Sequence, residues 1–409
     1  MDIREAALKL HRDNQGKLGV VSKVPVTTRY DLSIAYTPGV AEPCKEIKQN
    51  KELSFELTCR GNMVAIITDG TRVLGLGDIG PEAAMPVMEG KAVLFKVFGD
   101  VDAVPICLDT KDPDKFIETV KMLQPTFAGI NLEDISSPKC YDIEDRLIEM
   151  LDIPVFHDDQ HGTAIAALSA VIGALRFVKK DIAEAKVVVN GAGAAGTAIG
   201  RLLVTAGAQN VIMVDMQGAL YQGMAGLNRV QEELAAKTNQ KKLQGNLAEM
   251  AKGADVIIGV SAPGSFTAEI IQSMNTDPIV IAMANPVPEI MYNDAKAAGA
   301  KVAGTGRSDA PNQVNNVTVF PGIFRGAMDV RARKINDEMK LAAAYAIAGL
   351  VADNDLREDY VVPDAFDPRV APAVAAAVAK AAIDTGVARI QVDPETVRAN
   401  TAARVKVGK

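Results

Sequence analysis

Two adjacent carboxylates flanked by two histidines are the first candidates for chemistry in this 409-residue chain. Asp158 and Asp159 follow a short apolar run, residues 154–156, and stand between His157 and His161. The apolar run is typical of a buried strand, and α/β proteins place their chemistry at the carboxyl ends of such strands. The two histidines also have the spacing of the zinc-binding H-E-x-x-H motif, so a zinc site is the alternative.

A second strand with acidic residues at its carboxyl end is predicted upstream. Residues 127–131 have strand character and are followed closely by Glu133 and Asp134. Parallel strands end at the same edge of a sheet, so these side chains are expected to converge with Asp158, Asp159 or both. A hard divalent cation such as Mg²⁺ or Mn²⁺ prefers oxygen ligands and relieves the repulsion between neighbouring carboxylates. The sequence therefore favours a Mg²⁺ or Mn²⁺ site.

Zinc is less well supported by the positions of the histidines. His157 directly follows the strand, and the next helix is expected to open at Gly162, after His161. The two rings are then not expected to share one helical face. The only other histidine is His11, so a zinc site would lack an obvious third imidazole ligand.

Lys91 is expected to face the protein core. It belongs to a helix predicted at residues 81–98, in which Pro86 should produce a kink or a restart. Beyond the proline, Lys91 lies three residues after Met88 and four before Phe95, on the apolar face. Burial lowers the pKa of a lysine, and this suits a general base. A lysine whose stem merely covers apolar surface is the alternative.

Tyr36 and Arg72 have positions that suit a ligand site. Tyr36 comes just before a helix start predicted at Thr37-Pro38, where the unpaired N–H groups favour negative charge. Its phenol is either a packing group or an acid. Arg72 lies in a glycine-rich loop after a predicted strand at residues 64–68. Its guanidinium suits a substrate carboxylate, and a plain surface arginine is the alternative.

The middle of the chain carries a dinucleotide-binding pattern. A predicted strand at residues 186–190 leads into a G-x-G-x-x-G sequence and then a helix, and a second strand ends in an aspartate. The first glycine should form the turn, the second should admit a pyrophosphate, and the third should allow close packing. The N–H groups of the intervening alanines should face the phosphates. These residues are Gly191, Gly193, Ala194, Ala195 and Gly196.

NAD is expected as the cofactor, and NADP is expected less. Asp215 ends the second strand and is placed to bind the hydroxyl groups of the adenosine ribose. The chain contains no lysine or arginine between Arg201 and Arg229, so a 2′-phosphate would find no nearby cation.

The patterns together predict an α/β protein with a Rossmann-type doubly wound dinucleotide domain and an α/β substrate and metal domain. The expected boundaries are residues 1–160 for the substrate and metal domain, 161–315 for the dinucleotide domain and 316–409 for a helical C-terminal segment. A chain with 48% hydrophobic residues can bury cores of this size.

Composition excludes several classes of function. The net charge of −7 argues against a basic nucleic-acid interface. Apolar runs of membrane-spanning length are not expected, and the acidic N-terminus is unlike a secretory signal. The four cysteines are scattered, which favours reduced thiols in the cytoplasm.

Taken together, these segments resemble the malic enzyme family in its short bacterial NAD-dependent form. The resemblance covers nearly the whole chain in the right order. It rests on residues 36–41, 68–70, 72–78, 89–91, 131–134, 154–164, 191–196, 284–286, 315–316 and 320–322.

The resemblance implies oxidative decarboxylation of (S)-malate to pyruvate and CO₂, with reduction of NAD and dependence on a divalent metal. It also implies decarboxylation of oxaloacetate and assembly as a homodimer or higher homo-oligomer. Malolactic conversion of malate to lactate is the alternative. The C-terminal segment is expected to pack back on the first domain.

The resemblance also implies roles for individual residues. Glu133, Asp134 and Asp159 are expected to bind the metal, with Asp158 behind them near Lys91. Lys91 is expected to be the base at the C2 hydroxyl, and Tyr36 the acid at C3. The residues expected to hold malate are Arg72, Asn285 and Asn316, and Asn285 is also expected to border the cofactor.

Overall fold

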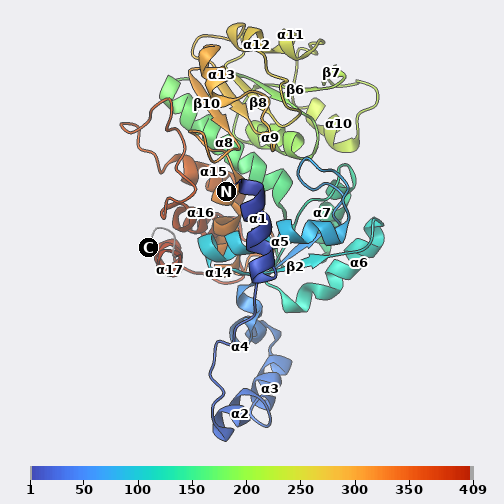
Figure 1. The fold of residues 1–409 in the computed structure, drawn as a ribbon, viewed down its shortest axis with the longest axis vertical. Coiled ribbons are helices and arrows are strands. Elements are labelled where there is room, and N and C mark those ends of the chain that lie inside the picture. Colours follow the sequence, from blue (N-terminus) through green and yellow to red (C-terminus); the bar gives the residue numbers. More distant parts are fainter. Residues whose placement is uncertain (1, 406–409) are drawn as a thin grey trace.

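The computed structural model of the chain describes residues 2–405 and contains two mainly parallel β-sheets, one after the other along the sequence (Figure 1). Helices surround both sheets, and this arrangement confirms the predicted α/β class. The two sheets are built from separate stretches of chain, as two α/β units would require. The boundaries predicted at residues 160 and 315 remain a proposal.

The first sheet is parallel and has the strand order β2-β1-β3-β4. Its central strand β1 reads Met-Val-Ala-Ile-Ile-Thr and is buried over five of its six residues, as a strand covered on both faces requires. The strands are β1 (Met63–Thr68), β2 (Asp102–Cys107), β3 (Gly129–Leu132) and β4 (Val155–His157).

The helices that accompany the first sheet begin before it and continue between its strands. They are α1 (Ile3–Asn14), α2 (Arg29–Ala35), α3 (Ala41–Gln49), α4 (Ser54–Leu57), α5 (Pro81–Gly99), α6 (Pro113–Leu123) and α7 (Lys139–Met150), with short 3₁₀ turns η1 (Lys51–Leu53), η2 (Cys59–Asn62) and η3 (Gln124–Thr126).

The second sheet has the order β10-β9-β8-β5-β6-β7 and is parallel except for β7. Its strands are β5 (Lys186–Asn190), β6 (Asn210–Asp215), β7 (Gly218–Ala219), β8 (Val256–Gly259), β9 (Ile279–Ala282) and β10 (Val302–Thr305). Its helices are α8 (Asp158–Val178), α9 (Ala194–Thr205), α10 (Arg229–Ala235), α11 (Leu247–Ala251), α12 (Ala268–Gln272) and α13 (Tyr292–Ala297).

The remaining chain is helical and returns to the first sheet. It comprises η4 (Asn316–Thr318), α14 (Phe320–Asp329), α15 (Asp337–Ala348), α16 (Val370–Asp384) and α17 (Pro394–Arg404). Helix α14 packs on α5, and the rings of Phe320 and Phe324 lie 4.6 Å and 5.3 Å from that of Phe95. Phe156 of β4 completes this aromatic group, 5.8 Å from Phe324.

Some of the predicted helix features were wrong. Helix α5 spans Pro81–Gly99, close to the predicted residues 81–98, and it continues through Pro86 as one helix without a restart. Helix α8 begins at Asp158 and not at Gly162, so the strand passes directly into the helix. The C-terminal segment is helical, as predicted.

The helix start predicted at Thr37-Pro38 was also wrong. The preceding residues 29–35 form α2, which is capped by Thr28, and Tyr36 is the C-terminal cap of that helix. The next helix begins only at Ala41. Tyr36 therefore lies after a helix and not before one, which removes the argument based on the positive end of a helix dipole.

Helix α8 is long and apolar enough to cross a membrane, contrary to the expectation that no segment would be. Its best 18-residue window has a mean hydropathy of 1.5, but 67% of that window is buried inside the protein. It contacts β4, β9, α9 and α15. Such burial is typical of a core helix, in which apolar residues occur on every side.

The aromatic contact between α5 and α14 provides a test of how the C-terminal segment is held. Phe95→Ala should lower the free energy of unfolding by about 3–5 kcal/mol, since a fully buried ring is lost from a packed core. The measurement is urea denaturation. Val97→Ala is the matched control on the same helix, and its effect should stay within about 0.5 kcal/mol, because Val97 is exposed. Equal denaturation midpoints for the two variants would contradict the packing role.

Candidate active site and metal centre

Three carboxylates converge at the carboxyl edge of the first sheet. Glu133 and Asp134 follow β3, and Asp159 lies in the first turn of α8, directly after the neighbouring strand β4. One oxygen from each lies within 4.8 Å of the others. Asp134 adopts a left-handed backbone conformation, with φ of 56°, and its N–H donates to Asp159 at 2.8 Å. The loop is thus shaped so that these acidic groups face one another.

Lys91 is buried in α5 and contacts the same cluster. Its Nζ lies 2.5 Å from Asp158 and 2.9 Å from Glu133, and it stands 4.3 Å above the ring of Phe320. The side chains of the two ion-paired partners are 0% and 5% exposed. The predicted burial of Lys91 on the apolar face of its helix is therefore confirmed.

The expected lowering of the Lys91 pKa was wrong for this arrangement. Burial alone favours the neutral amine, but the charges of Asp158 and Glu133 outweigh it and raise the pKa of Lys91. The prediction failed because helical periodicity reveals burial and does not reveal the partners that meet the side chain in space.

The carboxylates are destabilised in their ionised forms. Burial raises the pKa of Glu133 to about 7 and the pKa of Asp158 to about 7, although Lys91 opposes both shifts. Burial, Asp159 and Glu133 raise the pKa of Asp134 to about 9. One ammonium therefore does not balance this group of carboxylates, and a further cation would.

The acidic cluster fits a divalent cation. All of its ligand atoms are oxygens, which Mg²⁺ and Mn²⁺ prefer. Asp134 Oδ2 is buried and has no hydrogen-bond partner in residues 2–405. A buried oxygen of this kind is costly unless it is compensated, and a cation bound by Glu133, Asp134 and Asp159 would compensate it.

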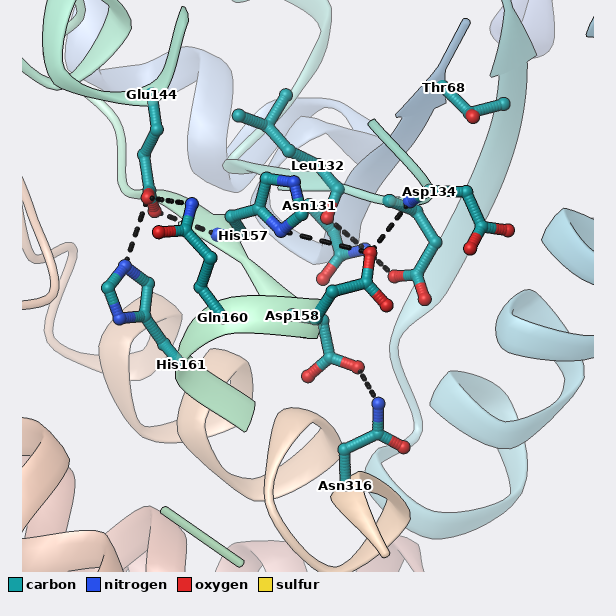
Figure 2. Close-up of polar contacts among 12 residues, drawn as sticks. Thr68, Asn131, Leu132, Asp134, Glu144, His157, Asp158, Gln160, His161 and Asn316 are labelled. Atoms are coloured by element: carbon teal, nitrogen blue, oxygen red, sulfur yellow. Dashed lines mark hydrogen bonds and ion pairs between the residues drawn. The ribbon is translucent and has the colours of Figure 1, made fainter. Parts of the chain in front are cut away.

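The two histidines do not form a zinc site. His161 Nε2 lies 3.0 Å from Glu144 on α7, which also accepts from the backbone N–H of His157 at 2.9 Å. Burial lowers the pKa of His157 to about 4, so its ring is neutral. The described residues place both rings beside the acidic cluster and not in it (Figure 2).

The residues predicted to bind the substrate lie around this edge, and Asn285 is placed there by its backbone. Arg72 is exposed, its backbone N–H donates to Asp134 O at 3.0 Å, and its guanidinium has no ion-pair partner within residues 2–405. Asn316 donates to Asp158 from the returning C-terminal segment. Asn285 follows β9, and its backbone O lies 3.3 Å from the position of a Cβ at Gly75, in the loop after Arg72. The first and second sheets therefore meet here.

The glycine-rich loop has the expected local geometry. Gly191 has φ of 113°, and a Cβ at Gly196 would lie 1.7 Å from the oxygen of Gly191. A Cβ at Gly193 would meet nothing within 4 Å, which leaves room for a ligand. Helix α9 begins at Ala194 and lacks a side-chain cap, so the N–H groups of Ala194 and Ala195 are placed to bind an anion. Asp215 ends the neighbouring strand β6.

Tyr36 is not brought to the cluster within one chain. It lies in a projecting segment, residues 28–50, which we call the arm and which contains α2 and α3 (Figure 1). Its side chain is 67% exposed, and neither helix of the arm buries a residue. Figure 1 shows the arm projecting from the body of the protein.

Two polar residues of the site were not predicted from the sequence. Asn131, within β3, donates to Glu133 at 2.8 Å and orients it. Glu144 lies four residues after Cys140 on the buried face of an amphipathic helix. An acidic residue on such a face is a signal that could have identified it, because a buried carboxylate needs partners.

The fold and the site define a class. A Rossmann-type dinucleotide domain is joined to an α/β unit whose sheet edge carries a lysine and a triad of carboxylates, and such a combination suits a metal-dependent oxidoreductase.

Comparisons with known proteins identify the family. Residues 15–148 match the N-terminal domain of malic enzymes, and residues 160–383 match the malic enzyme NAD binding domain. The chain belongs to the malic enzyme family.

Individual relatives match most or all of the chain. The Bacillus subtilis (strain 168) bifunctional malic/malolactic enzyme is 59% identical and covers 100% of both chains. The Geobacillus stearothermophilus NAD-dependent malic enzyme is 55% identical over 91% of this chain and 78% of its own. The crystal structure of malic enzyme from Pyrococcus horikoshii Ot3 is 48% identical, with a TM-score of 0.95 over 99% of this chain and 96% of its own.

The metal centre can be tested without turnover. Asp134→Asn should weaken Mn²⁺ binding by about 100-fold or more, since loss of an outer partner alone typically costs about 10- to 100-fold. Calorimetric titration of the protein without substrate measures it. Asp114→Asn is the control, because Asp114 is an exposed carboxylate on α6, away from the cluster. Equal Mn²⁺ affinity in both variants would exclude Asp134 as a ligand.

Proposed function

We propose that this chain catalyses the oxidative decarboxylation of (S)-malate to pyruvate and CO₂ with reduction of NAD. The observation that carries the proposal is the contact of buried Lys91 with Asp158 and Glu133 beside a triad of carboxylates, at the edge where the two sheets meet. Membership of the malic enzyme family supports it. Decarboxylation of oxaloacetate at the same site follows from the same chemistry.

Glu133, Asp134 and Asp159 are proposed to hold Mg²⁺ or Mn²⁺. When bound, the cation supplies a Lewis acid that polarises an oxygen of the substrate at C2. Arg72, with its unpaired guanidinium, is suited to a carboxylate of malate, and Asn285 and Asn316 approach from the second sheet and the C-terminal segment.

Lys91 is proposed to take the proton from the C2 hydroxyl as hydride leaves C2 for the nicotinamide. In the structure its pKa is raised by Asp158 and Glu133. Glu133 belongs both to this ion pair and to the proposed ligand set. A cation held by Glu133 would offset part of the negative charge that keeps Lys91 protonated, and this would favour the neutral amine that a base requires.

NAD is proposed as the cofactor in preference to NADP. The relative from Geobacillus stearothermophilus is named an NAD-dependent malic enzyme. Asp215 lies at the end of β6, where an acidic side chain binds the ribose hydroxyls and repels a 2′-phosphate. The cytoplasmic location expected from composition stays a prediction.

Malolactic conversion is the second candidate reaction. It is favoured by the name of the Bacillus subtilis relative, a bifunctional malic/malolactic enzyme. In that reaction the hydride taken from malate is returned to pyruvate before the cofactor leaves, so lactate forms and no reduced cofactor accumulates. The same residues serve both outcomes, and the lifetime of the bound products decides between them.

Product analysis tests both candidates. With (S)-malate, NAD and Mn²⁺, the enzyme should release pyruvate and reduced NAD in equal amounts. The measurements are absorbance of reduced cofactor and chromatography of the acids. Lactate without reduced NAD would assign the malolactic reaction, and neither product from metal-loaded protein would refute the proposal. Replacing NAD by NADP in the same assay should lower kcat/KM.

We infer that the working unit is a homodimer in which the arm of each chain completes the site of its partner. The arm exposes Tyr30, Leu32, Ile34 and Tyr36, each more than 50% accessible. Short helices that bury nothing are marginal in water, so α2 and α3 require a surface to pack against. A second copy supplies that surface and receives Tyr36 as the acid that protonates C3 of enolpyruvate.

Mixed dimers test the shared site. Lys91→Ala should abolish hydride transfer, and Tyr36→Phe should slow protonation of enolpyruvate. If Tyr36 acts on the partner's site, a mixed dimer of the two variants contains one intact site and one doubly altered site. Unfolding and refolding a one-to-one mixture should then restore about a quarter of the wild-type sites, because half of the dimers are mixed.

The steady-state rate of the mixture is the readout, with each variant refolded alone as the control. A tyrosine acting within its own chain leaves one defect in every site, so a mixture with no recovered activity would contradict the exchanged arm.

A further inference from the structure

Glu144 stands out among the buried ionisable groups because the proposed reaction does not use it. It lies on α7, its side chain is 5% exposed, and it contacts neither Lys91 nor the acidic triad. Burial opposes its ionisation, but the neighbouring His161 and His157 hold the pKa of Glu144 at about 2. A fully buried carboxylate that stays charged needs an arrangement of donors built around it.

Those donors all come from one short stretch of chain. Glu144 Oε1 accepts from the backbone N–H of His157 at 2.9 Å, and Oε2 accepts from Gln160 Nε2 and His161 Nε2, both at 3.0 Å. A carboxylate only accepts, so His161 carries its proton on Nε2. We call this group the Glu144 anchor: Glu144, His157, Gln160 and His161.

The residues of the Glu144 anchor lie on both sides of the two aspartates of the site in the sequence. His157 precedes Asp158 and Asp159, and Gln160 and His161 follow them, within the first turn of α8. Figure 2 shows Glu144 on one side of this turn and Asp134 on the other. The backbone N–H of His157 and the side chains of Gln160 and His161 therefore bind Glu144 from both sides of the two aspartates in the sequence.

On its other side, this turn is held by the contacts of the site itself, which are those of Asp158 with Lys91 and Asn316 and that of Asp159 with the N–H of Asp134. Strand β4 ends at His157 and α8 begins at the next residue, with no side-chain cap on the helix. Both ring nitrogens of His157 lack a hydrogen-bond partner within residues 2–405. An uncapped helix start leaves several N–H groups unsatisfied and free to fray, so the rotation of the turn has to be fixed from outside it.

We propose that Glu144 is a positioning residue for the metal centre. Its carboxylate fixes the rotation of the first turn of α8, so that Asp159 faces Glu133 and Asp134 while Asp158 faces Lys91. The inference rests on the proposed metal site. In metalloproteins, residues that do not touch the metal orient the residues that bind it, and this is the function proposed for Glu144.

The variant Glu144→Gln tests the proposal. Glutamine keeps the shape but turns an NH₂ group toward donors, so at least one of the three contacts is lost. Electron paramagnetic resonance of free Mn²⁺ in titrations of the full-length protein, without malate, should show binding about 10- to 100-fold weaker than in the wild type. Calorimetric NAD affinity should stay within about twofold, because the cofactor loop belongs to the second sheet.

Two further variants make the result specific. Glu149→Gln changes an exposed glutamate on the same helix and should bind Mn²⁺ like the wild type. Gln160→Met removes one donor at similar volume and should weaken Mn²⁺ binding in the same direction by a smaller factor. It decides the question if Glu144→Gln fails to fold.

The outcomes separate the possible failures. Wild-type Mn²⁺ affinity in Glu144→Gln, or in Gln160→Met when the first variant is unfolded, overturns the positioning role. Equal losses of Mn²⁺ and NAD affinity in Glu144→Gln would show that Glu144 only supports the fold, and this result also overturns the positioning role. A wild-type protein that binds no Mn²⁺ refutes the proposed metal centre itself, and the inference falls with it.

Discussion

The ion pair between Lys91 and Asp158 is the contact on which the arrangement of the site depends. Both groups are removed from water, so each is tolerable only because the other is present, and loss of either leaves a buried unpaired charge. The pair joins α5 to the start of α8, Glu133 adds the end of β3, and Asn316 adds the returning C-terminal segment. Chain segments far apart in sequence are thereby held at one point, where proton transfer and metal binding would both occur.

The features that were predictable from sequence were those with a local periodic signal. The position of Lys91 relative to Met88 and Phe95 was sufficient to predict its burial, because all three residues lie in one helix beyond Pro86. The convergence of Glu133 with Asp159 followed from the rule that parallel strands end at a common edge. Neither pattern shows which residues contact Lys91 in space, so the direction of the Lys91 pKa shift was predicted wrongly.

Other features depend on contacts between distant segments and leave little local trace. Helix α8 starts at Asp158 because Glu144 and Lys91 bind its first turn, whereas the sequence pattern predicts a loop there. The position of Tyr36 depends on how the arm leaves the body of the protein, and no pattern within residues 28–50 encodes that direction. Helix ends and projecting segments are therefore where sequence and structure diverge.

The direct passage from β4 into α8 has a mechanical consequence. Helix α8 starts at the first sheet and runs on to contact β9 of the second, so it is a single rigid rod shared by both halves of the molecule. Any rocking of one half against the other must tilt this rod, and the tilt displaces Asp158 and Asp159 at its tip. A movement of one half relative to the other would therefore be transmitted along α8 to the two aspartates that face Lys91 and the acidic triad.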